Sequence, residues 1–199
     1  MEHTVIISGF GGQGLLFAGT VLARAAMAEG LEVLWIPTYG PEMRGGSAAC
    51  TVIIADRPIG SPVVDHVDAV IALSGPALEH YRSAVAPGGL LVVDGTMVQL
   101  PPSDEIEIVA PACTSLARTA GDDRLVSIVA LGALVARRPM VDAGAVREAL
   151  RAVVGAKHPE ALQADLEAFD AGMSLLCSPE PGRGPGRIAT EGGAWTASD

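Results

Sequence analysis

The chain has 199 residues, of which 49% are hydrophobic, 18% charged and 4% aromatic. This length suits one domain with a sizeable core, which small aliphatic residues must build because aromatic residues are scarce. The formal net charge of −10 argues against a general nucleic-acid-binding protein, since an acidic domain repels phosphate backbones.

The first 36 residues predict a strand, a glycine-rich turn, a helix and a second strand. The strand is expected over 4–8, the glycine cluster over 9–14, the helix over 15–29 and the second strand over 32–36. Gly30 follows the helix at the position where glycine commonly ends one. This order is typical of a βαβ unit, which implies parallel strands.

The rest of the chain alternates strands and helices at first and becomes helical after residue 109. Further strands are predicted over 47–55, 69–74, 90–94 and 105–109, and further helices over 77–85, 113–120, 124–137, 142–154 and 159–176. This pattern predicts an α/β fold of three layers, Rossmann-like, with a mostly parallel sheet and helices on both faces.

Two segments are predicted to lack regular structure. The stretch 37–46 is rich in Pro and Gly and is predicted to be a long crossover loop between the second and third strands. The stretch 178–199 is rich in Pro, Gly and Arg and is predicted to be a disordered tail. One domain is therefore expected over 1–177.

Neither a metal site nor a targeting segment is apparent. Cys50, Cys113 and Cys177 lack the C-x-x-C spacing of metal and redox sites. The N-terminus has no basic region ahead of an apolar one, and the longest apolar helical stretch, 125–136, is too short to span a bilayer. A cytoplasmic location without membrane contact is expected.

The glycine cluster has two interpretations. Gly9, Gly11 and Gly14 match G-x-G-x-x-G between a strand and a helix, where backbone N–H groups can bind a phosphate. The same glycines also suit a tight turn that binds nothing. A dinucleotide site further needs an acidic residue at the end of the second strand, and none stands there. NAD binding is therefore disfavoured, while phosphate binding and pure packing stay open.

Two motifs together resemble the gamma subunit of the 2-oxoacid:ferredoxin oxidoreductases. They are Gly11-Gly12-Gln13-Gly14 and Tyr39-Gly40-Pro41-Glu42-Met43-Arg44-Gly45-Gly46. The resemblance continues through 59–64 and 87–91 and extends more weakly to Pro111 and 131–134, so it covers roughly 4–172. The second motif is more similar to the 2-oxoglutarate and branched-chain types than to the indolepyruvate type.

The resemblance implies a subunit of a thiamine-diphosphate-dependent enzyme. That enzyme oxidatively decarboxylates a 2-oxoacid, with 2-oxoglutarate favoured, to its acyl-CoA and reduces ferredoxin. The implied partners are alpha and beta subunits, with a delta subunit as an option, and ferredoxin through the complex. This chain is expected to bind no cofactor alone. Thiamine diphosphate, an iron–sulfur cluster and coenzyme A would belong to the assembled complex.

Ten residues in two loops are expected to contact a ligand or a partner, and none of them is expected to be catalytic or to bind a metal. They are Gly9, Gly11, Gly12, Gln13, Gly14, Tyr39, Glu42, Arg44, Gly45 and Gly46. Arg44 can pair with Glu42, or it can bind a carboxylate or phosphate of a partner subunit or of coenzyme A. Tyr39 can pack or form an interface, and the Gln13 amide can bond the turn backbone or a partner.

Other polar residues are expected to be structural. Asp94 is expected to be a turn residue or helix cap rather than an acid catalyst, and Cys113 an inert buried thiol. Ser127 stands where similar chains are expected to carry Asn. Two alternative functions stay open: a stand-alone nucleotide-binding module that uses the 9–14 loop, and a structural assembly subunit without ligand contact.

Overall fold

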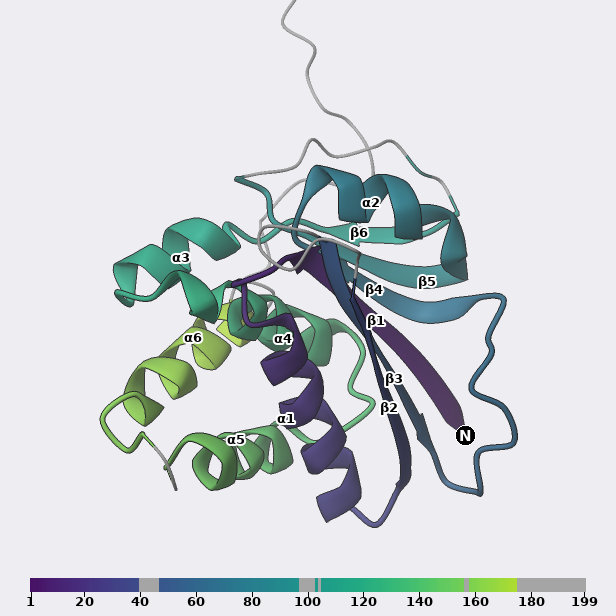
Figure 1. The fold of residues 1–199 in the computed structure, drawn as a ribbon, viewed down its shortest axis with the longest axis horizontal. Helices are drawn as coiled ribbons and strands as arrows, with labels where there is room; N and C mark the ends of the chain where they lie inside the picture. The colour runs from purple at the N-terminus through teal and green to yellow at the C-terminus, as the bar shows by residue number, and fades with distance from the viewer. Residues whose placement is uncertain (40–46, 97–102, 104, 156–157, 175–199) are drawn as a thin grey trace, which may run out of the picture.

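A computed structural model of the chain describes residues 1–39, 47–96, 103, 105–155 and 158–174. These residues form a six-stranded sheet in the order β2-β3-β1-β4-β5-β6 (Figure 1). The strands are β1 (Glu2–Phe10), β2 (Glu32–Tyr39), β3 (Ser47–Ala55), β4 (Val67–Ala72), β5 (Val85–Val93) and β6 (Glu107–Val109). Strands β1, β4, β5 and β6 pair in parallel, whereas β3 is antiparallel to both β1 and β2.

Helices cover both faces of the sheet, so the predicted three-layer α/β fold is confirmed (Figure 1). Helix α2 (Gly75–Tyr81) packs on one face and is followed by a 3₁₀ turn, Arg82–Ala84. The other helices lie on the opposite side: α1 (Leu15–Ala28), α3 (Cys113–Thr119), α4 (Val126–Arg137), α5 (Ala143–Leu150) and α6 (Leu162–Ser174). A 3₁₀ turn, Asp123–Leu125, precedes α4, and a π-helical turn, Arg151–Gly155, follows α5. None of the helices within the described ranges is long and apolar enough to cross a membrane.

The predicted crossover between the second and third strands is wrong. Strand β3 lies between β1 and β2 and runs antiparallel to both, so the β2–β3 connection joins neighbouring antiparallel strands. The physical reason is length, because a parallel crossover takes a dozen or more residues and this connection is shorter. The sheet is consequently mixed, and β2 does not pair with β1.

The strand predicted over 90–94 begins earlier than expected, because the segment Pro87-Gly88-Gly89 does not precede the strand but belongs to it. The segment lies inside β5, where the register against β4 shifts between Val67 and Ala69. A β-bulge of this kind absorbs extra residues without ending the strand. The helix predicted over 77–85 accordingly ends earlier, at Tyr81.

Alternating strand residues build an apolar layer on each face of the sheet. Val5 and Ile7 of β1 belong to the layer under α1 and α4, whereas Ile6 belongs to the layer under α2. All residues of α4 from Val126 to Val135 are buried, which confirms that this helix lies in the core.

Helices α4 and α6 cross with their backbones in contact at two glycines. A Cβ built on Gly132 would collide with the carbonyl oxygen of Phe169, and one built on Gly172 would collide with the carbonyl oxygen of Val129. Only hydrogen atoms fit at these two α-carbons. The pair therefore fixes how closely α6 approaches the buried helix.

The edges of the sheet are β2 and β6. Strand β2 carries Pro37 opposite Cys50 of β3, so one edge position has no backbone N–H. Strand β6 has three residues, and its Glu107 forms ion pairs with Arg137 and Arg138. The tail predicted over 178–199 lies outside the described residues, and the domain boundary at 177 stays a prediction.

The Asp165 carboxyl is buried near the start of α6, with 6% of the residue exposed. Burial raises its pKa from 3.8 to about 6; the Asp122 carboxylate acts in the same direction, and the Arg124 guanidinium partly offsets both. A raised pKa means that the folded chain favours the neutral acid. Asp165 therefore contributes stability below pH 4 that is lost as the pH rises through 6.

Replacing Asp165 by Asn should raise the free energy of unfolding at pH 7.5 by about 2 kcal/mol, because the amide is neutral at every pH. The gain should vanish at pH 4, where Asp165 is protonated in the folded chain. Denaturant unfolding of both proteins at the two pH values measures this. Asp65→Asn, at an exposed position, is the matched control. An equal gain at both pH values would contradict the assignment.

Candidate functional site

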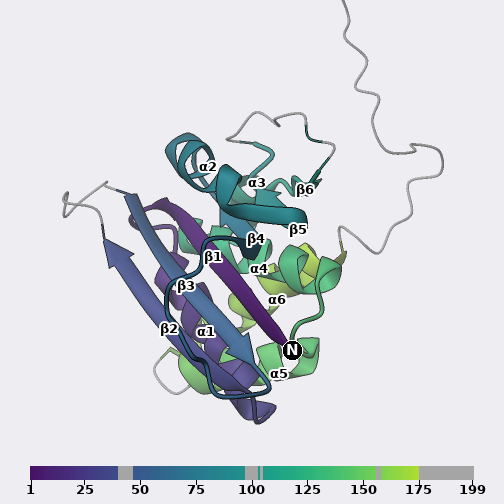
Figure 2. The ribbon, with the colours of Figure 1, turned by 90° about the vertical axis from the view of Figure 1, so that its right-hand side faces the viewer.

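The glycine-rich turn after β1 and the two residues that flank the 40–46 segment, Tyr39 and Ser47, lie at one end of the sheet, where β1 and β2 finish and β3 begins (Figure 2). Gly9 near the end of β1 and Tyr39 at the end of β2 both lie opposite Ala48 of β3. The glycine-rich turn after β1 and the connection between β2 and β3 consequently leave the sheet side by side. Tyr39 is described only through its backbone. Glu42, Arg44, Gly45 and Gly46 lie outside the described residues, so their roles stay predictions.

The same end of the sheet, between β1 and β4, is also its topological switch point. Strands β1 and β4 are parallel neighbours, and β1 leads into α1 on one face while β4 leads into α2 on the other. In open α/β sheets, ligands bind in the crevice at such a point, beyond the carboxyl ends of the strands.

Gln13 ties the ends of β1 and β4 together. Its side-chain oxygen accepts a hydrogen bond from the Phe10 N–H at 2.7 Å, and its side-chain nitrogen donates to the Leu73 carbonyl oxygen at 3.1 Å. A Cβ on Gly9 would collide with that side-chain oxygen. Of the two roles left open for Gln13, the structure has the bond to the chain's own backbone.

The remaining glycines of the turn have different surroundings. Gly14 precedes α1 with φ at +76°, and a Cβ there would lie 2.5 Å from the Arg124 carbonyl oxygen and 2.8 Å from Ser127 Oγ. Gly12 has φ at +100°, and a Cβ built on it would meet no described atom within 4 Å. Gly11 is exposed. Gly14 is thus required by its backbone conformation and by contact with the Arg124 carbonyl, a side chain at Gly9 would displace the Gln13 amide, and Gly11 and Gly12 are accessible to another molecule.

The start of α1 keeps the chemical features of an anion site. Within the described residues no side chain caps the helix, so its first-turn N–H groups face the turn. The backbone carbonyl of Arg124 lies beside Gly14, and the Arg124 guanidinium is exposed and pairs with the Asp122 carboxylate at 2.5 Å. Ser127 Oγ is the one fully buried side-chain polar atom of the described residues that lacks a hydrogen-bond partner. The predicted contacts of the turn with a ligand stay predictions.

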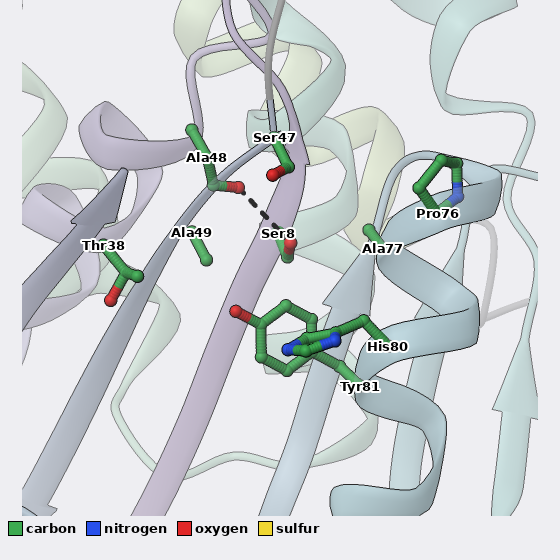
Figure 3. A pocket seen from close by; sticks show the side chains of 9 residues that line it. All are labelled: Ser8, Thr38, Ser47, Ala48, Ala49, Pro76, Ala77, His80 and Tyr81. Carbon is green, nitrogen blue, oxygen red and sulfur yellow. Dashed lines mark hydrogen bonds between the residues drawn. The ribbon is translucent and has the colours of Figure 1, made fainter. Parts of the chain in front are cut away.

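A hollow of about 340 Å³ opens on the α2 face of the sheet, at the end where β1 and β2 finish (Figure 3). Its described lining is formed by Ser8, Thr38, Ser47, Ala48, Ala49, Pro76, Ala77, His80 and Tyr81. The sequence analysis did not find these residues. The five strand residues are small and lie near strand ends, and the other four come from α2; that these segments lie together becomes visible only once the strand order is known.

Asp94 is a structural cap, as predicted. Its carboxylate is fully buried and accepts hydrogen bonds from the backbone N–H and the hydroxyl of Thr96 and of Thr114. It thereby joins the end of β5 to the first turn of α3.

Cys113 is buried, as predicted, and its inertness stays a prediction that a raised pKa supports. Burial raises its thiol pKa, and the Asp94 carboxylate raises it further. Cys50 is likewise buried, with a pKa of about 12. Among the residues that the structure describes, no group of three or more His, Cys, Asp or Glu side chains could hold a metal ion.

Comparison with protein families gives one match that covers most of the chain. Residues 4–175 match the family described as pyruvate ferredoxin/flavodoxin oxidoreductase. Ketoisovalerate oxidoreductase subunit VorA of Methanothermobacter thermautotrophicus is 37% identical over 172 residues, which are 86% of this chain and 36% of VorA. The chain thus spans about a third of the VorA relatives that it matches.

Another relative matches over nearly its whole length. The 2-oxoglutarate synthase subunit KorC of Methanothermobacter marburgensis is 34% identical over 184 residues, which cover 88% of this chain and 97% of KorC.

Two solved structures share the fold. One is a keto/oxoacid ferredoxin oxidoreductase gamma subunit from Geobacter sulfurreducens. Its TM-score is 0.74 at 32% identity, and 86% of this chain and 96% of that chain are covered. The other is 2-oxoglutarate:ferredoxin oxidoreductase from Magnetococcus marinus with 2-oxoglutarate, coenzyme A and succinyl-CoA bound. Its TM-score is 0.80 at 27% identity, and 94% of this chain and 33% of that chain are covered.

Proposed function

Because the chain belongs to the pyruvate ferredoxin/flavodoxin oxidoreductase family, we propose that it acts as the gamma subunit of a 2-oxoacid:ferredoxin oxidoreductase. The likeness to KorC carries this proposal, since it extends over nearly the whole of both chains. The complex would decarboxylate a 2-oxoacid on thiamine diphosphate, transfer the acyl group to coenzyme A and pass two electrons to ferredoxin. We propose 2-oxoglutarate as the substrate, as the name of KorC suggests, and the cytoplasm as the location.

Within such a complex this chain would bind and orient rather than carry out chemistry. We assign thiamine diphosphate and the iron–sulfur clusters to the alpha, beta and delta partners. The accessible backbone at Gly11 and Gly12, together with the uncapped start of α1, fits a phosphate of coenzyme A. The β2–β3 connection begins and ends at the same end of the sheet as the glycine-rich turn, which supports a shared contact surface for coenzyme A and a partner subunit.

Purification of the tagged chain from its own cells, under gentle anaerobic conditions, tests the proposal. We expect co-elution of alpha and beta subunits that carry thiamine diphosphate, and reduction of a viologen dye by the complex with 2-oxoglutarate and coenzyme A. The chain alone should give no turnover. Turnover by the chain alone, or elution without oxidoreductase partners, would rule the proposal out. A panel of 2-oxoacids then identifies the substrate.

Arg44→Ala should weaken the affinity for a partner subunit or for coenzyme A about ten- to a hundredfold, because the loss of a charge-assisted hydrogen bond has an effect of that size. A guanidinium between glycines is suited to a carboxylate or phosphate of another molecule. Weaker co-elution would indicate a partner subunit, and a raised KM for coenzyme A would indicate the cofactor. Arg57→Ala, with an exposed side chain, is the matched control. If only the unfolding midpoint falls, Arg44 is a structural residue that pairs with Glu42.

A further inference from the structure

The 3₁₀ turn Asp123–Leu125 lies between the glycine-rich turn and the start of α6. On one side, the Arg124 carbonyl oxygen lies so close to Gly14 that a Cβ there would be 2.5 Å from it. On the other side, the 3₁₀ turn packs against α6, whose first turns carry the buried Asp165. A movement of the 3₁₀ turn therefore reaches both the start of α1 and the start of α6.

The 3₁₀ turn is held by a few local bonds. The Asp122 carboxylate accepts a hydrogen bond from the Arg124 N–H at 2.8 Å, and the Asp122 carbonyl oxygen accepts one from the Leu125 N–H at 3.0 Å. Gly121, directly before these residues, has φ at +88°, and a Cβ built on it would meet no described atom within 4 Å. A glycine in this conformation and in open space can change its backbone angles readily. Gly121 is therefore suited to act as a hinge.

Two buried polar groups beside the 3₁₀ turn lack a hydrogen bond from the described residues. The Ser127 hydroxyl is fully buried and has no partner. The ionisation of the Asp165 carboxyl is influenced by burial and by two charged neighbours, but by no hydrogen bond. A buried polar group without a hydrogen bond is destabilising until it reaches water. Opening of the fold at this place relieves both groups at once.

Two charged groups face Asp165, and both belong to the residues that hold the 3₁₀ turn. The Asp122 carboxylate repels an ionised Asp165, and the Arg124 guanidinium attracts it. The other charged side chains on the elements packed against α6 have ion-pair partners of their own: Arg118–Asp123, Arg137–Glu107, Arg147–Asp170 and Arg151–Glu148. The charge on Asp165 consequently acts on Asp122, the residue whose carboxylate caps the 3₁₀ turn.

We propose that Asp165 is a pH-sensitive switch for the glycine-rich turn. While Asp165 is neutral, the 3₁₀ turn stays closed on Gly14. Once Asp165 is ionised, repulsion from Asp122 and hydration of the new carboxylate open the 3₁₀ turn and loosen the start of α1. The inference concerns the chain alone and does not rest on the proposed function.

The direction of the pH effect follows from the environment of Asp165. Burial raises the pKa of this carboxyl from 3.8 to about 6 in the closed arrangement, whereas a hydrated carboxyl in the open arrangement keeps the ordinary value. The closed arrangement is therefore favoured below pH 4 and loses stability as the pH rises through 6. Between pH 5 and pH 7.5 these two pKa values increase the open population about tenfold.

Amide hydrogen exchange of the full-length chain, followed by NMR at pH 5 and pH 7.5, tests the proposal. The reporters are the Leu125 N–H in the 3₁₀ turn and the Ala18 N–H, which donates to the Gly14 carbonyl oxygen. We expect the protection factors of both, corrected for the intrinsic effect of pH on exchange, to be about tenfold lower at pH 7.5. The Leu78 N–H in α2, on the opposite face of the sheet, should keep the same protection factor.

Variants separate the switch from other effects of pH. Asp165→Asn should remove the difference between the two pH values, because the amide is neutral at both. Ser127→Ala, which removes the unpaired hydroxyl, should raise both protection factors about tenfold at each pH and keep the difference between them. Asp65→Asn, at an exposed position, is the matched control and should behave as the wild type. Protection of the Ala18 N–H that does not change with pH, a difference that persists in Asp165→Asn, or an equal change at the Leu78 N–H would overturn the proposal.

Discussion

Replacing Gly172 by alanine is expected to lower the free energy of unfolding by about 3 kcal/mol. The new methyl group would occupy the position of the Val129 carbonyl oxygen on α4, and a backbone atom cannot rotate away as a side chain can. Helix α6 would have to move off the most buried helix of the fold and leave gaps around Phe169, which is fully buried.

Denaturant unfolding measures this loss of stability. Two further variants show whether the loss comes from the contact between α4 and α6. Gly132→Ala, on the other side of the same crossing, should cost a similar amount because it collides with the Phe169 carbonyl oxygen. Gly75→Ala at the start of α2, where a Cβ would meet no described atom within 4 Å, should be neutral or slightly stabilising. Equal stability of Gly172→Ala and Gly75→Ala would mean that the two helices do not touch at this point.

The second large effect is expected from Asp94→Ala, with a loss of about 3 kcal/mol or more. The carboxylate satisfies the backbone N–H and the hydroxyl of both Thr96 and Thr114. Its removal leaves the buried N–H and hydroxyl of Thr114 without an acceptor and separates α3 from the end of β5. Thermal and denaturant unfolding of the purified variant provide the measurement.

An exposed helix cap provides the comparison for Asp94. Asp142 accepts hydrogen bonds from the Gly144 and Ala145 N–H groups at the start of α5. Asp142→Ala should lower the free energy of unfolding by about 1 kcal/mol, the usual value for an exposed cap. If the two substitutions lower the free energy of unfolding equally, the burial of Asp94 adds nothing to the stability that its hydrogen bonds provide.

These two carboxylates illustrate what the sequence could predict. Asp142 precedes an amphipathic helix and caps it as expected, because a cap depends on neighbours two and three residues away. Asp94 was expected to be a turn residue or cap for a similarly local reason. The fully apolar pattern of 126–135 likewise predicts the burial that α4 shows.

Features that depend on distant pairings were not predictable in this way. The short β2–β3 connection is enough to exclude a parallel crossover, but the position of β3 between β1 and β2 is a choice of strand order, and the local patterns of the strands are compatible with other orders. The role of Gln13 depends on the Leu73 carbonyl, 60 residues away in sequence. Gly132 and Gly172 are ordinary helix glycines until the crossing of α4 and α6 is known.

The two edges of the sheet restrict how this chain can meet another polypeptide. An unpaired edge is a template for strand addition and aggregation, and proteins blunt such edges with proline, charged residues or short strands. Here Pro37 removes a donor from β2, while β6 is three residues long and carries the ion-paired Glu107. Neither edge is suited to continue the sheet into a neighbouring molecule. Assembly through loops and helix faces is therefore favoured, and the chain can be held in a complex without the hazard of open-ended strand stacking.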